Sequence, residues 1–390
     1  MKKKEYRLTE INKRRGAGKT IQGMVLILTL SLASLACSTD TLIGAAGGNN
    51  RPVPIPTGQK QNIVQGTAVP TMIPSPTPYP TAAGRLAFVS YRDGNNEIYV
   101  MNADGSNLMR LTNDQANDDH PVWSPNGNWI VFASDRGDDW DIYSMHANGG
   151  GLARLTTALG KDWAPAWSPN GTQIAFESFR DGNWEIYVMS SDGSNQVRLT
   201  NHTAGDSHPV WSPNGRQLAF VSNRDGSADI YLVNTDGSGL RRITDDPKPD
   251  ADPVWSPDGK KLAFRSWRDG NAEVYVINLE DGSLVRVTDN LYEDGTPVWS
   301  PDGSRLAFRS ELNGDWELFV VNADGSNLIS LTENEAFDGD PVWSPDGLHL
   351  AFQSNRDGNA EVYVINADGS GSKRLTYVEP EYDGDPVWAP

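Results

Sequence analysis

An aspartate stands five residues before each of seven regularly spaced tryptophans. Six of the seven units also carry an arginine two residues after a serine, in a segment that reads S-x-R-D-G in five of them and S-x-R-G-D at Arg136. The aspartates are Asp118, Asp162, Asp206, Asp250, Asp294, Asp338 and Asp383, and the arginines are Arg92, Arg136, Arg180, Arg224, Arg268 and Arg356. A ring of carboxylates could bind a cation such as Ca²⁺. Alternatively, each aspartate pairs with the arginine of its own unit and needs no ligand. We favour the structural pairing and keep the cation ring as the alternative.

One unit breaks this pattern, because Glu311-Leu312-Asn313-Gly314 replaces the R-D-G segment. Asp294 would thereby lose its arginine. An unpaired carboxylate among like charges has a raised proton affinity or recruits a cation. We therefore expect Asp294 to be the most perturbed of the seven aspartates and the nucleus of any Ca²⁺ site. A simply hydrated Asp294 is the alternative, and no other cofactor is expected.

The loops between each R-L-T segment and the following aspartate differ in every unit, whereas the turns at the other end of the unit are nearly constant. Variable loops on a repeated scaffold are where binding is usually carried. Aromatic residues collect at the same end, and flat rings stack on sugars and peptide side chains. We predict that this end binds an envelope protein, peptide or glycan. The predicted partner-binding residues are Trp163, Trp184, Trp267, Trp316, Tyr292 and Phe337.

The sequence contains no recognisable nucleophile with a base, since it has no G-x-S-x-G, no H-E-x-x-H and no pair of cysteines. A propeller enzyme such as a polysaccharide lyase or glycosidase needs polar residues that are unique to one unit and held together. Candidates are His120, His208, Lys161 and Lys248, but the sequence does not bring them together. We assign no catalytic residue and favour a binding or scaffold function, with an enzyme acting at the channel mouth as the alternative.

The elements that position these residues follow from a repeat. The group W-[SA]-P recurs with a spacing of 44 residues five times and 45 once, and each unit holds four short apolar runs separated by Gly, Asp and Asn turns. This pattern is typical of a four-stranded propeller blade. The series opens at Leu86 without a P-V-W strand and closes at Trp388 with one to spare. We predict an all-β, seven-bladed propeller over residues 84–390, closed by pairing of Pro386–Trp388 with Leu86–Ser90.

The first 83 residues have a different composition. A basic stretch and an apolar run of sixteen residues indicate a signal peptide over 1–36, because the run is short for a membrane span. The only cysteine, Cys37, follows Leu-Ala-Ser-Leu-Ala in a context that resembles a bacterial lipobox. Lipidation of Cys37 is predicted, and an incidental cysteine after an ordinary signal is the alternative. Residues 37–83 are rich in Pro and Thr, which predicts a disordered tether.

The formal net charge of −18 argues against nucleic acid and anionic lipid surfaces as partners. Removal of the basic leader makes the remaining chain more acidic still. We expect an exported monomer that is lipid-anchored on the extracytoplasmic side of a bacterial membrane and touches the membrane only through its N-terminal lipid.

The motifs L-A-F-x-S, R-D-G-N-x-E-I-Y and W-S-P-D-G resemble the WD-like propeller repeat of the TolB family, which also occurs in prolyl-oligopeptidase-type peptidases. The resemblance covers nearly all of residues 84–390. It implies a propeller and export, since TolB is the periplasmic partner of a peptidoglycan-associated lipoprotein. TolB has six blades and an additional N-terminal domain, so we expect a lipoprotein form and not a close orthologue. The peptidases carry a hydrolase domain for which this chain has no room.

Overall fold

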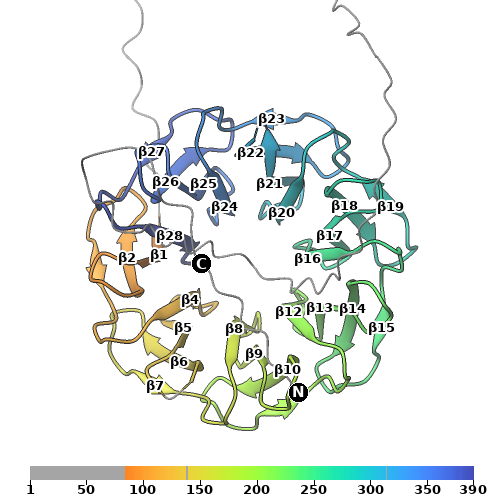
Figure 1. Cartoon of the computed structure of the whole chain (residues 1–390), viewed down its shortest axis with the longest axis horizontal. Coiled ribbons are helices and arrows are strands. Elements are labelled where there is room, and N and C mark those ends of the chain that lie inside the picture. Colours follow the sequence, from red (N-terminus) through yellow and green to blue (C-terminus); the bar gives the residue numbers. More distant parts are fainter. Residues whose placement is uncertain (1–83, 138, 313) are drawn as a thin grey trace, which may run out of the picture. The chain divides into compact units, whose positions relative to one another are not determined.

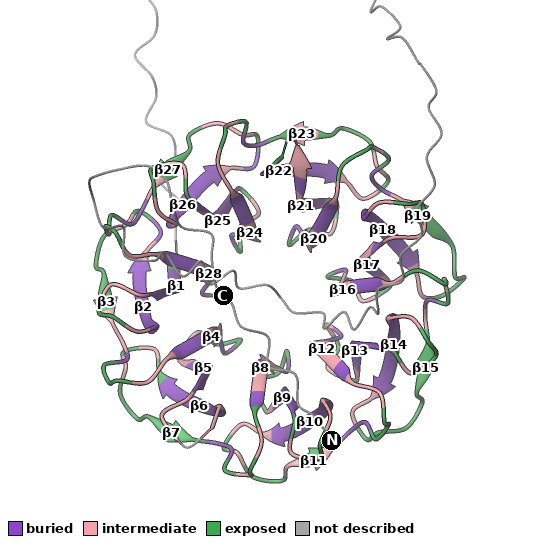
Figure 2. Ribbon diagram, in the orientation of Figure 1, coloured by how far each residue is buried: buried purple, intermediate pink, exposed green. Residues whose placement is uncertain are grey.

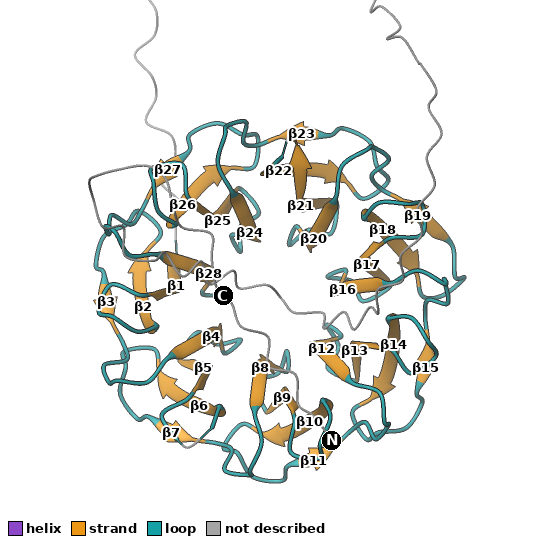
Figure 3. Cartoon of the chain, in the orientation of Figure 1, coloured by secondary structure: helices purple, strands orange, loops and turns teal. Residues whose placement is uncertain are grey.

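The computed structural model describes residues 84–137, 139–312 and 314–390. In these residues, seven four-stranded antiparallel sheets are arranged around a central axis (Figure 1), and strands are joined by loops alone (Figure 3). No helix that could span a membrane occurs in this part of the chain. The predicted seven-bladed all-β propeller is confirmed, whereas the signal peptide, Cys37 and the tether lie outside the described residues.

Each blade is named below by its innermost strand. The innermost strands are β4 (Asp118–Trp123), β8 (Asp162–Trp167), β12 (Asp206–Trp211), β16 (Asp250–Trp255), β20 (Asp294–Trp299), β24 (Asp338–Trp343) and β28 (Asp383–Trp388). The second strands are β5 (Trp129–Ser134), β9 (Gln173–Ser178), β13 (Gln217–Ser222), β17 (Lys261–Ser266), β21 (Arg305–Leu312), β25 (His349–Ser354) and β1 (Arg85–Ser90).

The third strands are β6 (Asp141–His146), β10 (Glu185–Ser190), β14 (Asp229–Asn234), β18 (Glu273–Asn278), β22 (Asp315–Asn322), β26 (Glu361–Asn366) and β2 (Glu97–Asn102). The outermost strands are β7 (Ala153–Arg154), β11 (Val197–Arg198), β15 (Arg241–Arg242), β19 (Leu284–Arg286), β23 (Ile329–Ser330), β27 (Lys373–Arg374) and β3 (Met109–Arg110).

The second strand of each blade is apolar along most of its length because neighbouring blades cover both of its faces. Its phenylalanine is at most 2% exposed in every blade; these residues are Phe88, Phe132, Phe176, Phe220, Phe264, Phe308 and Phe352. One core cluster joins Val100 of β2 with Trp123 of β4 and Phe132 of β5. Figure 2 shows the resulting buried strands as purple arrows inside an exposed outer rim. A blade therefore depends on its neighbours for its core.

The ring closes as the repeat predicts. Leu86 pairs with Trp388, and Ser90 pairs with Asp383, so the C-terminal strand β28 becomes the innermost strand of the first blade. In Figure 1 the blue β28 lies beside the orange β1 and β2. This closure leaves no open sheet edge between the first and last blades.

The two ends of the propeller differ. We define the variable face by the loops that join second to third strands, such as 91–96, and outermost strands to the next blade, such as 111–117. We define the constant face by the W-S-P turns and the hairpins between third and outermost strands. Each innermost strand begins at its aspartate on the variable face and ends at its tryptophan on the constant face. The R-D-G loops and the aspartates therefore meet on the variable face, as expected.

Candidate functional site

Arginine–aspartate pairs connect the loops on the variable face in six blades. In the β4 blade, Nη2 of Arg136 lies 2.5 Å from the Asp118 carboxylate, and Asp118 is fully buried. The other pairs are Arg92–Asp383 (2.7 Å), Arg180–Asp162 (2.9 Å), Arg224–Asp206 (2.7 Å), Arg268–Asp250 (3.0 Å) and Arg356–Asp338 (2.8 Å). The predicted structural pairing is confirmed, because each of these carboxylates is neutralised within its own blade.

Asp294 at the start of β20 has no arginine partner among the described residues. Asn290 Nδ2 donates a hydrogen bond to its Oδ2 at 2.6 Å, while Oδ1 has no partner in this part of the chain. Burial raises the pKa of Asp294 to about 6. Burial also raises the pKa of Asp118 to about 6, although Arg136 opposes that shift. The missing arginine therefore changes the contacts of Asp294. Its pKa is nevertheless raised to about the same value as that of Asp118.

The donor set around Asp294 is small for a metal ion. Nowhere in the described ranges do three or more His, Cys, Asp or Glu side chains gather in a metal-binding group. Ca²⁺ usually takes six to eight oxygen ligands. A Ca²⁺ site at Asp294 stays a prediction.

Three of the predicted partner-binding tryptophans lie against ionisable side chains. The pairs are Trp267–Arg265, with the guanidinium carbon 4.4 Å from the ring centroid, Trp316–Arg309 at 4.6 Å, and Trp163–His120, with ring centroids 4.5 Å apart. Trp163 also meets Trp140 edge-on. A cation against an indole face is attracted by the ring quadrupole. These tryptophans therefore hold charged groups in place on the variable face.

The other three predicted aromatics have different surroundings. Trp184 packs edge-on against Phe179, and the ring of Phe337 fills the space where a side chain at Gly339 would lie. Tyr292 is 38% exposed and follows Leu291, which is 94% exposed. Their role in partner binding stays a prediction. Leu291 and Leu159, an 89% exposed residue of another variable loop, were not singled out from the sequence.

A second ring of residues, which was not predicted from the sequence, lies two positions after the aspartates on the innermost strands. The third residue of each innermost strand has a positive φ of 48–56° and sits at a register shift before the proline. These seven residues, the axial ring, are His120, Ala164, His208, Asp252, Thr296, Asp340 and Asp385, and all are half-buried. Because the backbone geometry recurs in every blade, it belongs to the fold. The side chains it presents differ from blade to blade.

Charged residues of the second strands lie beside the axial ring. Arg265 Nε is 3.1 Å from Asp252 Oδ2, but their geometry is not that of a hydrogen bond, and within the described chain both atoms lack a hydrogen-bond partner. Arg309 Nη1 is 3.7 Å from Asp340 Oδ1. Burial and the nearby Arg309 lower the pKa of Arg265 against the pull of Asp252. Two guanidinium groups are thus held close together on neighbouring blades.

The histidines lie on the β4 and β12 blades. The His208 backbone N–H donates to Glu177 Oε1 at 2.6 Å. Burial disfavours the charged form of His120, but Asp119, Asp385 and Glu177 together raise its pKa. Burial and neighbouring carboxylates raise the pKa of Asp385 to about 7. Glu177 thus interacts with the backbone of His208 and with the charge of His120.

Lys161 and Lys248, the other two candidate enzyme residues, lie exposed in loops on the variable face. Comparison of the repeats could have found the side chains of the axial ring, since their position is one of two variable residues between a constant aspartate and a constant proline. The side-chain contacts between neighbouring blades could not have been predicted by comparing the repeats.

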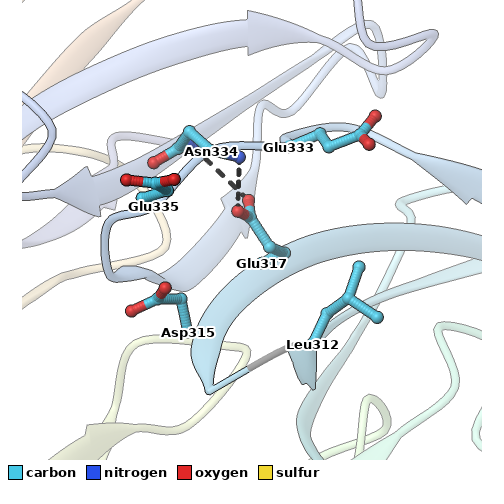
Figure 4. Close-up of a pocket in the computed structure, with 6 residues that line it drawn as sticks. All are labelled: Leu312, Asp315, Glu317, Glu333, Asn334 and Glu335. Atoms are coloured by element: carbon cyan, nitrogen blue, oxygen red, sulfur yellow. Dashed lines mark hydrogen bonds between the residues drawn. The ribbon is translucent and has the colours of Figure 1, made fainter.

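Two pockets flank the propeller ends. One, of about 480 Å³, opens on the variable face of the β20 blade and is lined by Leu312, Asp315, Glu317, Glu333, Asn334 and Glu335 (Figure 4). The other, of about 630 Å³, lies on the constant face and is lined by Arg85, Gly127, Asn128, Trp129, His146, Ala147 and Asn148. Only the first belongs to the face that varies between blades.

Short stretches of this chain are similar to curated TolB proteins. The Tol-Pal system protein TolB of Geobacter sulfurreducens is 50% identical over 44 residues, which are 11% of this chain and 10% of that protein. TolB of Desulfosudis oleivorans is 39% identical over 49 residues, 13% of this chain and 11% of that protein. The chain thus matches only about one repeat's length of these relatives, which fits a TolB-like protein that is not a close orthologue.

Solved structures share the propeller at low sequence identity. TolB from Acinetobacter baumannii superposes with a TM-score of 0.54 at 18% identity, covering 78% of this chain and 82% of that one. Oligogalacturonate lyase from Vibrio parahaemolyticus superposes with a TM-score of 0.62 at 17% identity, covering 73% of this chain and 86% of that one. A puromycin hydrolase superposes with a TM-score of 0.63 at 16% identity, covering 77% of this chain and 53% of that one. Because these proteins differ in function, the likeness establishes the fold and not the chemistry.

The family profile described as the TolB beta propeller domain matches residues 54–162, 157–251, 209–290 and 243–390. These segments together cover the whole described propeller. The chain belongs to the TolB β-propeller domain family.

Proposed function

We propose that this protein is an exported, lipid-anchored propeller that binds a partner protein with its variable face. The observation that carries the proposal is the contrast between the two ends. The turns of the constant face repeat from blade to blade, whereas the axial ring holds His, Ala, Asp or Thr in different blades. A repeated scaffold with one varied end is suited to recognising one particular surface.

The side chains gathered near the axis favour a protein or peptide partner. Arg265 and Arg309 each have an Nε without a hydrogen-bond partner among the described residues, and each is backed by a tryptophan. Arginine and tryptophan are the residues most enriched at binding hot spots. A carboxylate of the partner would satisfy these guanidinium groups bidentately. A glycan partner is the other outcome that a binding test can return.

The location rests on the N-terminal sequence and on the relatives. Cys37 lies outside the described residues, so lipidation is supported by the lipobox-like sequence alone. The relatives that match one repeat are named as Tol-Pal system proteins, which supports an envelope location and a protein partner.

Site-specific photo-crosslinking in the full-length, membrane-attached protein tests the proposal. A photoreactive residue replaces Trp267 or Trp316 on the variable face, and in control proteins it replaces Leu240 or Leu348, which are exposed at the other end of the blades. We expect a discrete crosslinked species from the two tryptophan positions. Equal crosslinking from the control positions, or none from the tryptophans, would contradict the assignment of the binding face.

Glu177 interacts with the His208 backbone and with the charge of His120, which favours a second candidate function, catalysis on a glycan. A carboxylate beside a histidine is suited to moving a proton to and from a sugar. A glycan array combined with a turnover assay on every bound sugar separates the two functions. Product that disappears in a His120→Ala, His208→Ala protein would favour the enzyme, and binding without product would favour the binding module.

A further inference from the structure

The acidic pocket of the β20 blade stands where other blades hold an arginine. In six blades the first acidic residue of the third strand is buried and pairs with the arginine of the R-L-T segment. The pairs are Arg110–Glu97 (2.7 Å), Arg154–Asp141 (2.5 Å), Arg198–Glu185 (2.7 Å), Arg242–Asp229 (2.7 Å), Arg286–Glu273 (3.0 Å) and Arg374–Glu361 (2.7 Å). A buried carboxylate paired with a partly exposed arginine is thus a regular part of the blade.

The β20 blade has the buried acidic residue but not the arginine that pairs with it in the other blades. Glu317 is 2% exposed, as buried as its counterparts, but Ser330 stands in the place of the arginine. Ser330 Oγ still donates to the Thr332 carbonyl at 2.8 Å, which is the bond that the arginine Nε makes elsewhere. The serine therefore replaces one neutral contact of the arginine and leaves its charge unreplaced.

Other parts of the same network are also missing from this blade. Leu312 replaces the arginine that pairs with the entry aspartate, and Phe319 replaces the tyrosine whose hydroxyl contacts the R-D-G aspartate in other blades. Two acids, Asp294 and Glu317, remain. Retention of both acids after loss of both arginines indicates that the carboxylates serve something other than the internal pairs.

Glu317 still accepts hydrogen bonds from neutral donors. The Asn334 backbone N–H donates to Oε1 at 2.6 Å, and equivalent backbone bonds are made to Glu185 and Glu361 in blades that keep the arginine. Burial and the nearby Asp338 raise the pKa of Glu317. In Glu185, by contrast, hydrogen bonds and Arg198 outweigh burial and lower the pKa. Relative to Glu185, Glu317 therefore lacks the arginine, and it also lacks an asparagine amide because Asp315 stands where Asn183 donates to Glu185.

A pocket lies beside Glu317, the carboxylate whose counterparts pair with the R-L-T arginine. Its volume of about 480 Å³ lies within the roughly 300–1,000 Å³ range of ligand pockets. Figure 4 shows Glu317 and Asn334 facing each other at its centre, with Asp315 and Glu335 nearby. Within the described part of the chain, none of the four lining carboxylates forms an ion pair, although such pairs are common elsewhere in the propeller.

We propose that this pocket binds the guanidinium group of an arginine on a partner protein, which would pair with Glu317 as the R-L-T arginine pairs with its counterparts in the other six blades. The planar guanidinium matches a carboxylate in fork geometry and is more weakly hydrated than an ammonium group, so it enters a partly buried site at lower cost. The assignment of the arginine to a partner rests on the proposed function. The preference of the pocket for guanidinium does not.

Titration of the full chain with N-acetyl-arginine amide tests the pocket directly. The readout is the chemical shift of the Leu312 methyl groups in methyl-labelled protein, because Leu312 lines the pocket. We expect saturable shifts that weaken at high salt. N-acetyl-citrulline amide, which has a similar shape and no charge, is the matched ligand. Equal shifts from the citrulline compound would overturn the proposal.

Two variants give the test a structural control. Ser330→Arg rebuilds the pair of the other blades and should weaken arginine-amide binding at least roughly tenfold, since the new guanidinium would pair with the Glu317 carboxylate. Leu328→Arg adds the same charge at a residue that is 58% exposed and should leave binding unchanged. If Ser330→Arg does not fold, Glu317→Gln should produce the same loss. Unchanged binding in the folded pocket variant would overturn the proposal.

Crosslinking separates this inference from the proposed function. If Ser330→Arg abolishes arginine-amide binding and weakens crosslinking from Trp267, both stand. If crosslinking is unchanged, the pocket does not receive the partner's arginine, and the proposed function survives. If neither tryptophan position crosslinks while arginine-amide binding is intact, the proposed function fails and the pocket's preference for guanidinium remains.

Discussion

The indole nitrogen of Trp388 donates a hydrogen bond to the carbonyl oxygen of Val342, 3.1 Å away. This bond joins the C-terminal strand β28 to β24 of the preceding blade, while β28 also pairs with β1. The same indole-to-carbonyl bond links five other pairs of neighbouring blades. The closing strand is therefore held to both of its neighbours.

We predict that deletion of residues 384–390 lowers the free energy of unfolding by several kcal/mol, because it opens the ring and unpairs β1. Trp388→Phe should cost about 1–3 kcal/mol, since it removes one buried hydrogen bond and part of the indole packing. Thermal and urea unfolding measure both changes. An unchanged melting temperature in the truncated protein would contradict the role of the closure.

Removal of one arginine of a repeat pair should destabilise the propeller strongly. Arg224 is 10% exposed and its partner Asp206 is fully buried, so Arg224→Met leaves a buried carboxylate without a cation. We expect a loss of about 3–5 kcal/mol. Asp206→Asn in the same protein should recover much of it. Urea unfolding of the two single variants and the double variant gives the coupling, and additive losses would contradict the pairing.

The stability contribution of Asp294 should depend on pH in a predictable direction. Burial raises its folded-state pKa from 3.8 to about 6. A carboxyl group whose pKa is higher in the folded state destabilises the fold as the pH rises from about 4 to about 6. Asp294→Asn should therefore stabilise the protein above pH 6 by on the order of 1–3 kcal/mol and have little effect near pH 4.

The matched variant for this pH test is Asp250→Asn, which leaves Arg268 without its carboxylate. We expect it to destabilise the protein at pH 7. Urea unfolding at pH 4, 5, 6 and 7.5 measures both variants. A loss of stability in Asp294→Asn as large as that in Asp250→Asn would show that Asp294 has a compensating partner.

Alanine at Trp267 or Trp316 should weaken partner binding by about 2 kcal/mol or more while leaving the ring folded. Each indole supports an arginine near the axis, so its loss also frees that arginine to move. Binding of the partner recovered by crosslinking is measured by titration calorimetry. Leu240→Ala on the constant face is the control, and an equal loss there would show that the faces are wrongly assigned.

Metabolic labelling with a fatty-acid analogue tests the N-terminal anchor. The wild-type protein should incorporate the label, and Cys37→Ser should not, because Cys37 is the only thiol in the chain. Label in both proteins would exclude thiol lipidation at this position.

The blade number, the closure and the arginine–aspartate pairs could be predicted because each follows from the period of the repeat. Leu86, Asp118 and Trp388 recur with their equivalents at fixed spacing, so their partners are set by strand order alone. Asp294 could be identified as exceptional for the same reason, since Leu312 stands at a position that is otherwise arginine.

The backbone geometry of the axial ring and the acidic pocket required the structure. The positive φ of His120 and its equivalents arises from a register shift between paired strands, which no residue type marks. The proximity of His120 to Trp163 and Glu177 depends on how neighbouring blades pack. The substitution at Ser330 was readable in the sequence, but its meaning was not, because the arginine and the acid that pair lie on different strands.

The closure also determines how the propeller responds to mechanical force. Strand β1, which leads out of the propeller toward residue 83, is an interior strand of its sheet, with β28 on one side and β2 on the other. A pull transmitted through the N-terminal segment therefore loads two hydrogen-bonded ladders at once, whereas an edge strand would peel from one. The propeller can consequently carry tension applied through its N-terminal end without the first blade unravelling.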